Sequence, residues 1–122
     1  NISDELFKVT RMMCDGSSRV AGLFRRGDDQ EALELFQDLL DVTRDFMSMV
    51  GVLRSEFVDV SDPQFSTLVE RVSELLGEMS EVLSGEDWIL LADLLEFEFN
   101  PVCEAWNKNL EKLRADIARR LD

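Results

Sequence analysis

Three carboxylates in the last third of the chain, Asp93, Glu96 and Glu104, come nearest in type and spacing to a metal or catalytic site. In a helix, Glu96, Asn100 and Glu104 share one face because they are four residues apart. Helical bundles that bind two iron ions combine inward carboxylates with a Glu-x-x-His pair from each of two helices, and this chain contains no histidine. We therefore expect solvated or paired acids and no cofactor, with a carboxylate-only metal-binding protein as an alternative.

The sequence does not contain a complete set of catalytic residues. A general acid or base needs a carboxylate of tuned pKa together with a partner group in a cleft. Burial among apolar neighbours would raise the pKa of Asp93 and Glu96, but the sequence offers no second component. Cys14 and Cys103 stand alone inside predicted helices, without a CxxC spacing. We expect two free, buried thiols that pack as small hydrophobic side chains, and a chain that is not an enzyme.

Four stretches carry apolar residues at alternating spacings of three and four, the pattern of helices in a bundle. They cover residues about 4–26, 29–57, 63–84 and 87–121. Residues 87–99 are apolar around nearly the whole helix, which requires burial on more than one side, and they are too few to span a bilayer. The expected seam of the last helix consists of Trp88, Ala92, Leu95, Phe99, Val102, Trp106, Leu110, Leu113, Ile117 and Leu121.

Glycine, aspartate and proline mark the ends of these helices. Gly27 and Gly85 are expected to end the first and third helices. Asp62-Pro63 is expected to begin the third, because the missing N–H of proline costs nothing at the first helical position. Short turns place consecutive helices antiparallel. The sequence therefore predicts one all-α domain over residues 1–122, an antiparallel up-down-up-down four-helix bundle.

Pro101 lies inside the long last helix, where proline removes a hydrogen bond and crowds the preceding turn. The seam also slips out of heptad spacing just past Pro101, and a kink near residues 97–101 would explain both features. We expect the kink either to open a groove beside Phe97 and Phe99 or only to curve the helix around its core. Whether the helix bends or breaks into two stays open.

The formal net charge is −13, from 13 basic and 26 acidic residues. Residues 28–106 carry three basic and twenty acidic residues, whereas each end is slightly basic. Phosphate binding needs clustered Lys and Arg, so we expect no nucleic-acid and no membrane partner. The acidic surface either serves solubility alone or favours partners with basic or apolar surfaces. No stretch resembles a signal peptide or a transmembrane segment, which predicts a cytoplasmic protein.

The last helix has more apolar residues than a bundle seam can use. Either the neighbouring helices wrap far enough to cover the surplus, or it forms an exposed patch of the kind that binds a partner helix. The residues expected in this patch are Ile89, Leu90, Leu94 and Phe97.

The end of the last helix is predicted to overhang the bundle because this helix is longer than its neighbours. An apolar stripe on the overhang would have to be buried by something else. A second copy of the chain, a segment upstream of Asn1 or a partner protein could bury it. The residues of this second predicted binding stripe are Leu110, Leu113, Ile117 and Leu121.

Residues 93–106 read Asp-Leu-Leu-Glu-Phe-Glu-Phe-Asn-Pro-Val-Cys-Glu-Ala-Trp. With Gly85-Glu86-Asp87 before it, this stretch resembles a motif, D-L-L-E-(F/Y)-E-x-x-P-x-x-E-x-W, of small uncharacterised bacterial helical proteins. The resemblance covers about a fifth of the chain and implies a domain of unknown function, without a mechanism. In size, acidity and helical character the chain is also similar to flagellar and type III export chaperones, although no motif carries that likeness.

These observations favour a non-enzymatic protein–protein interaction module, either an adaptor or a chaperone-like protein. The alternative is a structural homo-oligomer with no separate ligand, such as a homodimer whose two-fold interface consumes the surplus apolar surface. Both hypotheses give the patch and the stripe the same role, which is contact with protein.

Overall fold

The computed structural model describes residues 2–56 and 63–121. Its helices are α1 (Ile2–Arg25), α2 (Asp29–Glu56), α3 (Pro63–Ser84) and a long final helix in three consecutive segments, α4 (Trp88–Leu94), η1 (Leu95–Phe99) and α5 (Asn100–Leu121). These described parts contain no strand, so the predicted all-α class is confirmed. The predicted N-cap Asp62 and the predicted end of the second helix at residue 57 lie outside the described residues.

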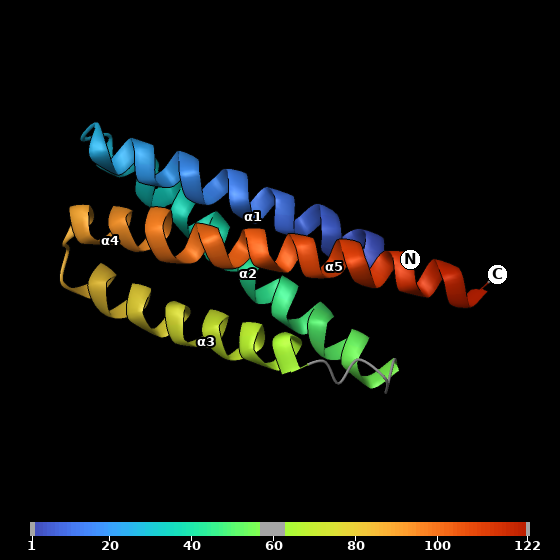
Figure 1. Ribbon diagram of the computed structural model, residues 1–122. Coiled ribbons are helices and arrows are strands. Elements are labelled where there is room, and N and C mark those ends of the chain that lie inside the picture. The colour runs from blue at the N-terminus through green and yellow to red at the C-terminus, as the bar shows by residue number, and fades with distance from the viewer. Residues whose placement is uncertain (1, 57–62, 122) are drawn as a thin grey trace.

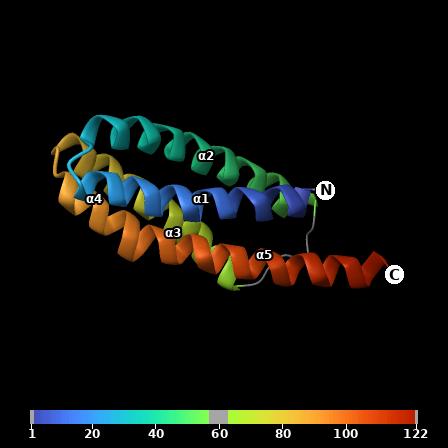
Figure 2. The same ribbon diagram turned by 90° about the horizontal axis from the view of Figure 1, so that it is seen from above.

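The helices form an antiparallel bundle in up-down-up-down order, as predicted (Figures 1 and 2). α1 packs against α2 and against the α4–α5 helix, and α3 packs against the same α4–α5 helix. Consecutive helices reverse direction because short turns join α1 to α2 and α3 to α4. Figure 1 also shows the last part of α5 extending beyond the N-terminal end of α1. The final helix therefore joins the α1–α2 hairpin to α3.

Trp106 of α5 lies at the centre of the core. Its indole packs edge-on against Phe46 of α2 and Phe65 of α3, with ring centroids 5.1 Å apart in each pair. All three side chains are buried, and an edge-to-face aromatic pair contributes about 0.5–1.5 kcal/mol beyond the burial of its surface. Trp106 thus connects α2 with α3 through the final helix.

The final helix contains a wide turn, η1, directly before Pro101. The N–H of Asn100 donates to the carbonyl of Leu95, five residues back instead of four. Pro101 has no N–H to donate, and its ring would crowd the carbonyl four residues earlier, so a wider turn accommodates it. The chain stays helical through this point. The final helix therefore has the predicted kink near Pro101 and is not broken into two.

The wide turn corrects the predicted seam by one position. The prediction placed Val102 in the core, whereas Cys103 is fully buried and Val102 is half-buried. The buried positions step from Leu95 to Phe99 to Cys103, so the slip occurs about two helical turns earlier than predicted. Its physical cause is the extra residue that the η1 turn takes in before the proline.

Two short turns end helices in different ways. Gly27 follows α1 with a φ of 81°, and the N–H of Asp28 donates to the carbonyl of Leu23 at 2.9 Å, as in a glycine-ended helix. α3 ends at Ser84, where predicted. The left-handed residue after it is Glu86, with a φ of 56°, rather than the glycine before it. Glu86 therefore holds a backbone conformation that favours glycine.

We expect Glu86→Gly to stabilise the bundle, because a non-glycine residue in the left-handed region costs about 1–2 kcal/mol, part of which the extra freedom of unfolded glycine offsets. Urea titration should show a free energy of unfolding higher by about 0.5–1 kcal/mol. Gly85→Ala is the matched control, since its Cβ would meet the carbonyl oxygens of Val82 and Glu81 at 3.6 and 3.8 Å, which are ordinary contact distances. A loss of stability in Glu86→Gly would contradict this account.

Candidate functional site

An exposed apolar stripe runs along α4 and η1. Of the large hydrophobic side chains that are exposed in the described residues, three belong to this segment: Ile89 at 54%, Leu90 at 45% and Phe97 at 66% exposure. Leu94 is half-buried and packs against the core. Leu90, Leu94 and Phe97 are four and three residues apart, so they share one side of the helix. We call Ile89, Leu90, Leu94 and Phe97 the α4–η1 face.

The side chains on the opposite side of this segment are buried in the core. Leu91, Ala92, Leu95 and Phe99 are all buried. The predicted alternative that neighbouring helices cover the whole surplus is therefore wrong for most of the α4–η1 face, and it holds only in part for the half-buried Leu94. The reason is geometric, since α1 and α3 pack on the flanks of the segment and leave its outer side open.

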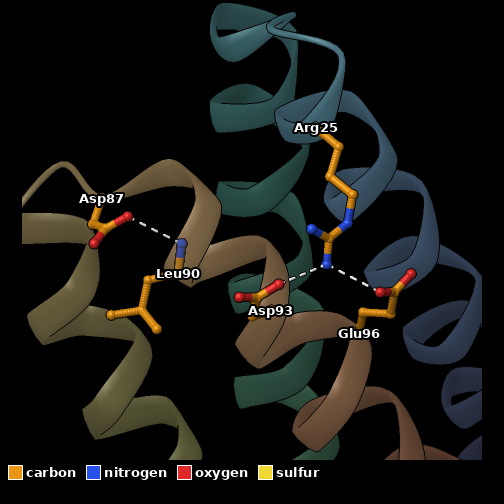
Figure 3. A network of polar contacts seen from close by, with 5 residues as sticks. All are labelled: Arg25, Asp87, Leu90, Asp93 and Glu96. Carbon is orange, nitrogen blue, oxygen red and sulfur yellow. Dashed lines mark hydrogen bonds and ion pairs between the residues drawn. The ribbon is translucent and has the colours of Figure 1, made fainter.

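Arg25, the last residue of α1, borders the face on one flank. Its Nη2 donates to Asp93 at 2.8 Å and to Glu96 at 3.0 Å, and its Cζ lies 5.8 Å from the centre of the Phe97 ring. Figure 3 shows the guanidinium between the two carboxylates, with Leu90 pointing away from it. The hydrogen bond with Asp93 and the charge of Glu96 raise the pKa of Arg25. These partly exposed pairs stabilise the fold little, but they fix α1 beside the face.

Arg71 of α3 borders the face on the other flank. It pairs with Glu98 of η1 at 3.2 Å and, on its own helix, with Glu74 at 3.2 Å and Glu78 at 3.7 Å. Residues 72–107 contain nine acidic and no basic residues. The α4–η1 face is therefore an apolar stripe in acidic surroundings.

The N-terminus of α4 is fixed by Asp87. Its carboxylate accepts a hydrogen bond from the N–H of Leu90 at 3.1 Å, as Figure 3 shows. Such an N-cap satisfies a backbone donor that would lack a partner at the start of the helix. Leu90 is thereby held at the first turn of the face.

The three carboxylates singled out from the sequence do not converge. Asp93 and Glu96 pair with Arg25, whereas Glu104 is exposed on α5. Across residues 2–56 and 63–121, no group of three or more Cys, Asp or Glu side chains is arranged to hold a metal ion. Asn100, predicted to share their face, instead contacts α1.

The predicted binding stripe on the overhang is corrected at its first positions. Leu110 is fully buried, so it cannot contact a partner in the folded chain. Leu113 is half-buried and packs against the core. The bundle extends further along α5 than helix lengths suggested, because the start of α1 covers this part: Arg114 pairs with Asp4 at 2.7 Å. The side chains of the remaining members, Ile117 and Leu121, lie outside the described residues.

A shallow groove of about 630 Å³ lies beside Pro101, but it is not the predicted one. Residues of α5 and the start of α3 line it, among them Gln64, Glu104 and Lys108. Phe99 is buried in the core and Phe97 belongs to the α4–η1 face. Most of the residues that line this groove are polar or charged, and neither of the two phenylalanines is among them.

A polar seam joins α1 to α5 behind the face. The Nδ2 of Asn100 donates to the Cys14 carbonyl at 2.9 Å and to Ser17 Oγ at 3.0 Å. One heptad later, the Nδ2 of Asn107 donates to Thr10 Oγ1 at 2.9 Å. Thr10 and Ser17 are buried, and each hydroxyl donates to a carbonyl of its own helix. In another register the half-buried carboxamides of Asn100 and Asn107 would lose these acceptors, whereas the two hydroxyls would keep the bonds within their own helix.

Sequence reasoning missed this seam. The available signal was the matched spacing of polar residues within otherwise apolar helices, since Thr10 and Ser17 are seven residues apart, as are Asn100 and Asn107. A polar residue at a seam position is a known device for setting helix register. The pattern is visible, but its pairing across the chain appears only in the fold.

The two cysteines meet in the same seam. Both are free and buried, as predicted. A hydrogen bond from the Cys103 thiol lowers the pKa of Cys14, and that hydrogen bond together with burial raises the pKa of Cys103. The contact between them was not predicted, because nothing in the sequence pairs positions so far apart.

Comparison with protein families finds a match over residues 1–109, to the family described as "Domain of unknown function (DUF8042)". The chain belongs to this family. The match includes the α4–η1 face and the whole polar seam. Comparison with the curated proteins and with the solved structures finds no match. In the described residues of this family member, no helix combines the length and apolar character needed to cross a bilayer.

We expect Asn100→Ala to lower the free energy of unfolding by about 1–2 kcal/mol, because it removes the hydrogen bonds that join α5 to the Cys14 carbonyl and the Ser17 hydroxyl of α1. Urea titration followed by circular dichroism measures this change. Lys108→Ala, on an exposed position of the same helix, is the control and should stay within about 0.5 kcal/mol. Equal effects of the two substitutions would contradict a structural role for the seam.

Proposed function

We propose that this DUF8042 domain is a non-enzymatic protein-binding module that uses the α4–η1 face. The observation that carries the proposal is the exposure of Ile89, Leu90 and Phe97 on a helix whose opposite side is fully packed. A contiguous group of exposed apolar side chains often marks a surface that binds another molecule. The face is also rigidly held, by the Asp87 cap and by the core behind it.

The absence of catalysis is part of the same proposal. Asp93 and Glu96, the best candidates for acid–base chemistry, are engaged with Arg25. The raised pKa of the buried Cys103 disfavours its thiolate. Binding is thus the role for which this surface is best suited.

A homodimer through the same face is the second candidate, and the charges disfavour it. A two-fold interface packs the same surface patch of the two subunits against itself. The carboxylates around Phe97 would then oppose identical carboxylates, which costs free energy when they lose water. A different protein, with an apolar and non-acidic surface, fits better.

We place this binding role in the bacterial cytoplasm, as an adaptor or a chaperone-like protein. The support is the acidic charge of −13, the D-L-L-E motif, and the likeness in size and helical character to export chaperones. The proposal treats the partner as a protein and not as nucleic acid or lipid, because the acidic surface repels phosphates.

Photocrosslinking in the source cell tests the proposal. A photoreactive phenylalanine analogue replaces Phe97 in one variant and Met12, which is 57% exposed on α1, in a control variant. We expect a covalent adduct with another protein from position 97 and not from position 12. An adduct with a second copy would favour the homodimer. Equal or absent labelling at the two positions would contradict a binding role for the face.

A further inference from the structure

We propose that the occupant of the α4–η1 face is a basic amphipathic helix of a partner protein. This inference rests on the proposed function and adds the chemistry of the partner. It follows from two independent properties of the face, the spacing of its apolar side chains and the charges around them.

The apolar side chains define the shape of the partner. Leu90, Leu94 and Phe97 form a straight stripe on one side of the helix, and the exposed Pro101 continues it. At 1.5 Å per residue, the stripe is about 16 Å long, or three helical turns. A partner helix that presents apolar residues at positions i, i+3 or i+4, and i+7 covers such a stripe along its length. The stripe is convex, so a helix packs on it through ridges and grooves instead of entering a deep pocket.

The surrounding charges define the polar face of the partner. Arg25 and Arg71 flank the stripe, and both are already engaged in ion pairs. Seven acidic residues lie on α3, on α4 and η1, and in the turn between α3 and α4, and against Arg25 and Arg71 they leave a formal excess of five negative charges. These acids are Glu74, Glu78, Glu86, Asp87, Asp93, Glu96 and Glu98.

Lys and Arg beside the apolar residues of a partner helix would meet these carboxylates at the rim of the contact. Rim charges mainly select the partner and speed association, so the acids give specificity while the apolar stripe gives affinity. An acidic helix with the same apolar pattern would be repelled by these carboxylates. A neutral helix would gain no electrostatic attraction from them. The same charges disfavour a second copy of this chain as the occupant.

Substitution of Arg25 tests whether the partner helix is positively or negatively charged. Its removal leaves the apolar stripe in place, but it frees Asp93 and Glu96 for a partner cation. A basic partner should therefore bind Arg25→Gln more tightly than the parent chain, whereas an acidic partner should bind it less tightly. A loss of fold would weaken both and is detected by circular dichroism.

The experiment uses three fluorescent 18-residue peptides and measures their binding to the full chain by anisotropy at about 0.15 M salt. The first peptide is an amphipathic helix with Leu at i, i+3, i+4 and i+7 and with Lys or Arg elsewhere. The second has Glu in place of each Lys and Arg. The third has the composition of the first in a scrambled order that removes the apolar face.

We expect the basic amphipathic peptide to bind at least about tenfold more tightly than the scrambled peptide, and the acidic peptide not to bind. Phe97→Ser should weaken binding about tenfold, since a central aromatic side chain often dominates an interface. The matched control Met12→Ser should leave it unchanged, and Arg25→Gln should strengthen it about two- to fivefold.

Equal binding of the basic and scrambled peptides would overturn the inference, because net charge alone would then explain it. Equal binding of the acidic peptide, or weaker binding by Arg25→Gln with its fold intact, would also overturn it. The failure of the proposed function is a separate result. If the protein crosslinked at position 97 in the source cell contacts it through an acidic or non-helical segment, the binding role stands and the basic-helix inference falls.

Discussion

The antiparallel register of α1 against the final helix depends on a row of polar contacts along their whole shared length. Asp4 meets Arg114, Thr10 meets Asn107, Ser17 meets Asn100, and Arg25 meets Asp93 and Glu96. A shift by one helical turn would break all of these contacts together and leave the half-buried carboxamides of Asn100 and Asn107 without their partners on α1. A polar residue at a seam position specifies the register of packed helices in a way that an apolar residue does not. The polar row therefore selects one arrangement from the several that the apolar seams allow.

The exposed face is a consequence of that arrangement and of the turn at Pro101. The polar row fixes α1 on one flank of α4 and η1, and Arg71 with Glu98 fixes α3 on the other. The η1 turn takes in one additional residue and brings Cys103, Trp106 and Leu110 into the core. Packing is satisfied on the inner side of the segment, so Phe97 stays outside. Exposure of the face thus results from a well-packed bundle and not from a weak core.

Much of the fold follows from local sequence. Apolar spacing gave the helices, Gly27 and Pro63 gave helix ends, and short turns gave the antiparallel order. The apolar surplus on α4 was also identifiable by counting positions on a helix. The sequence placed Leu110 on the helix seam but beyond the bundle, and its cover by the bundle itself was not predicted, because that depends on how far α1 extends beside α5. The Asn100 contacts, the cysteine pair and the left-handed Glu86 also depend on the packing of distant segments, which periodicity does not describe.

The central claim is that a single chain holds the α4–η1 face open for a different protein. Absolute molar mass from light scattering on a sizing column, at micromolar concentration, tests it most directly. The account predicts 14.0 kDa for the parent chain and the same mass for a Phe97→Asp variant. A mass near 28 kDa for the parent chain, reduced to 14.0 kDa by Phe97→Asp, would mean that the face is covered by a second copy and would contradict the account.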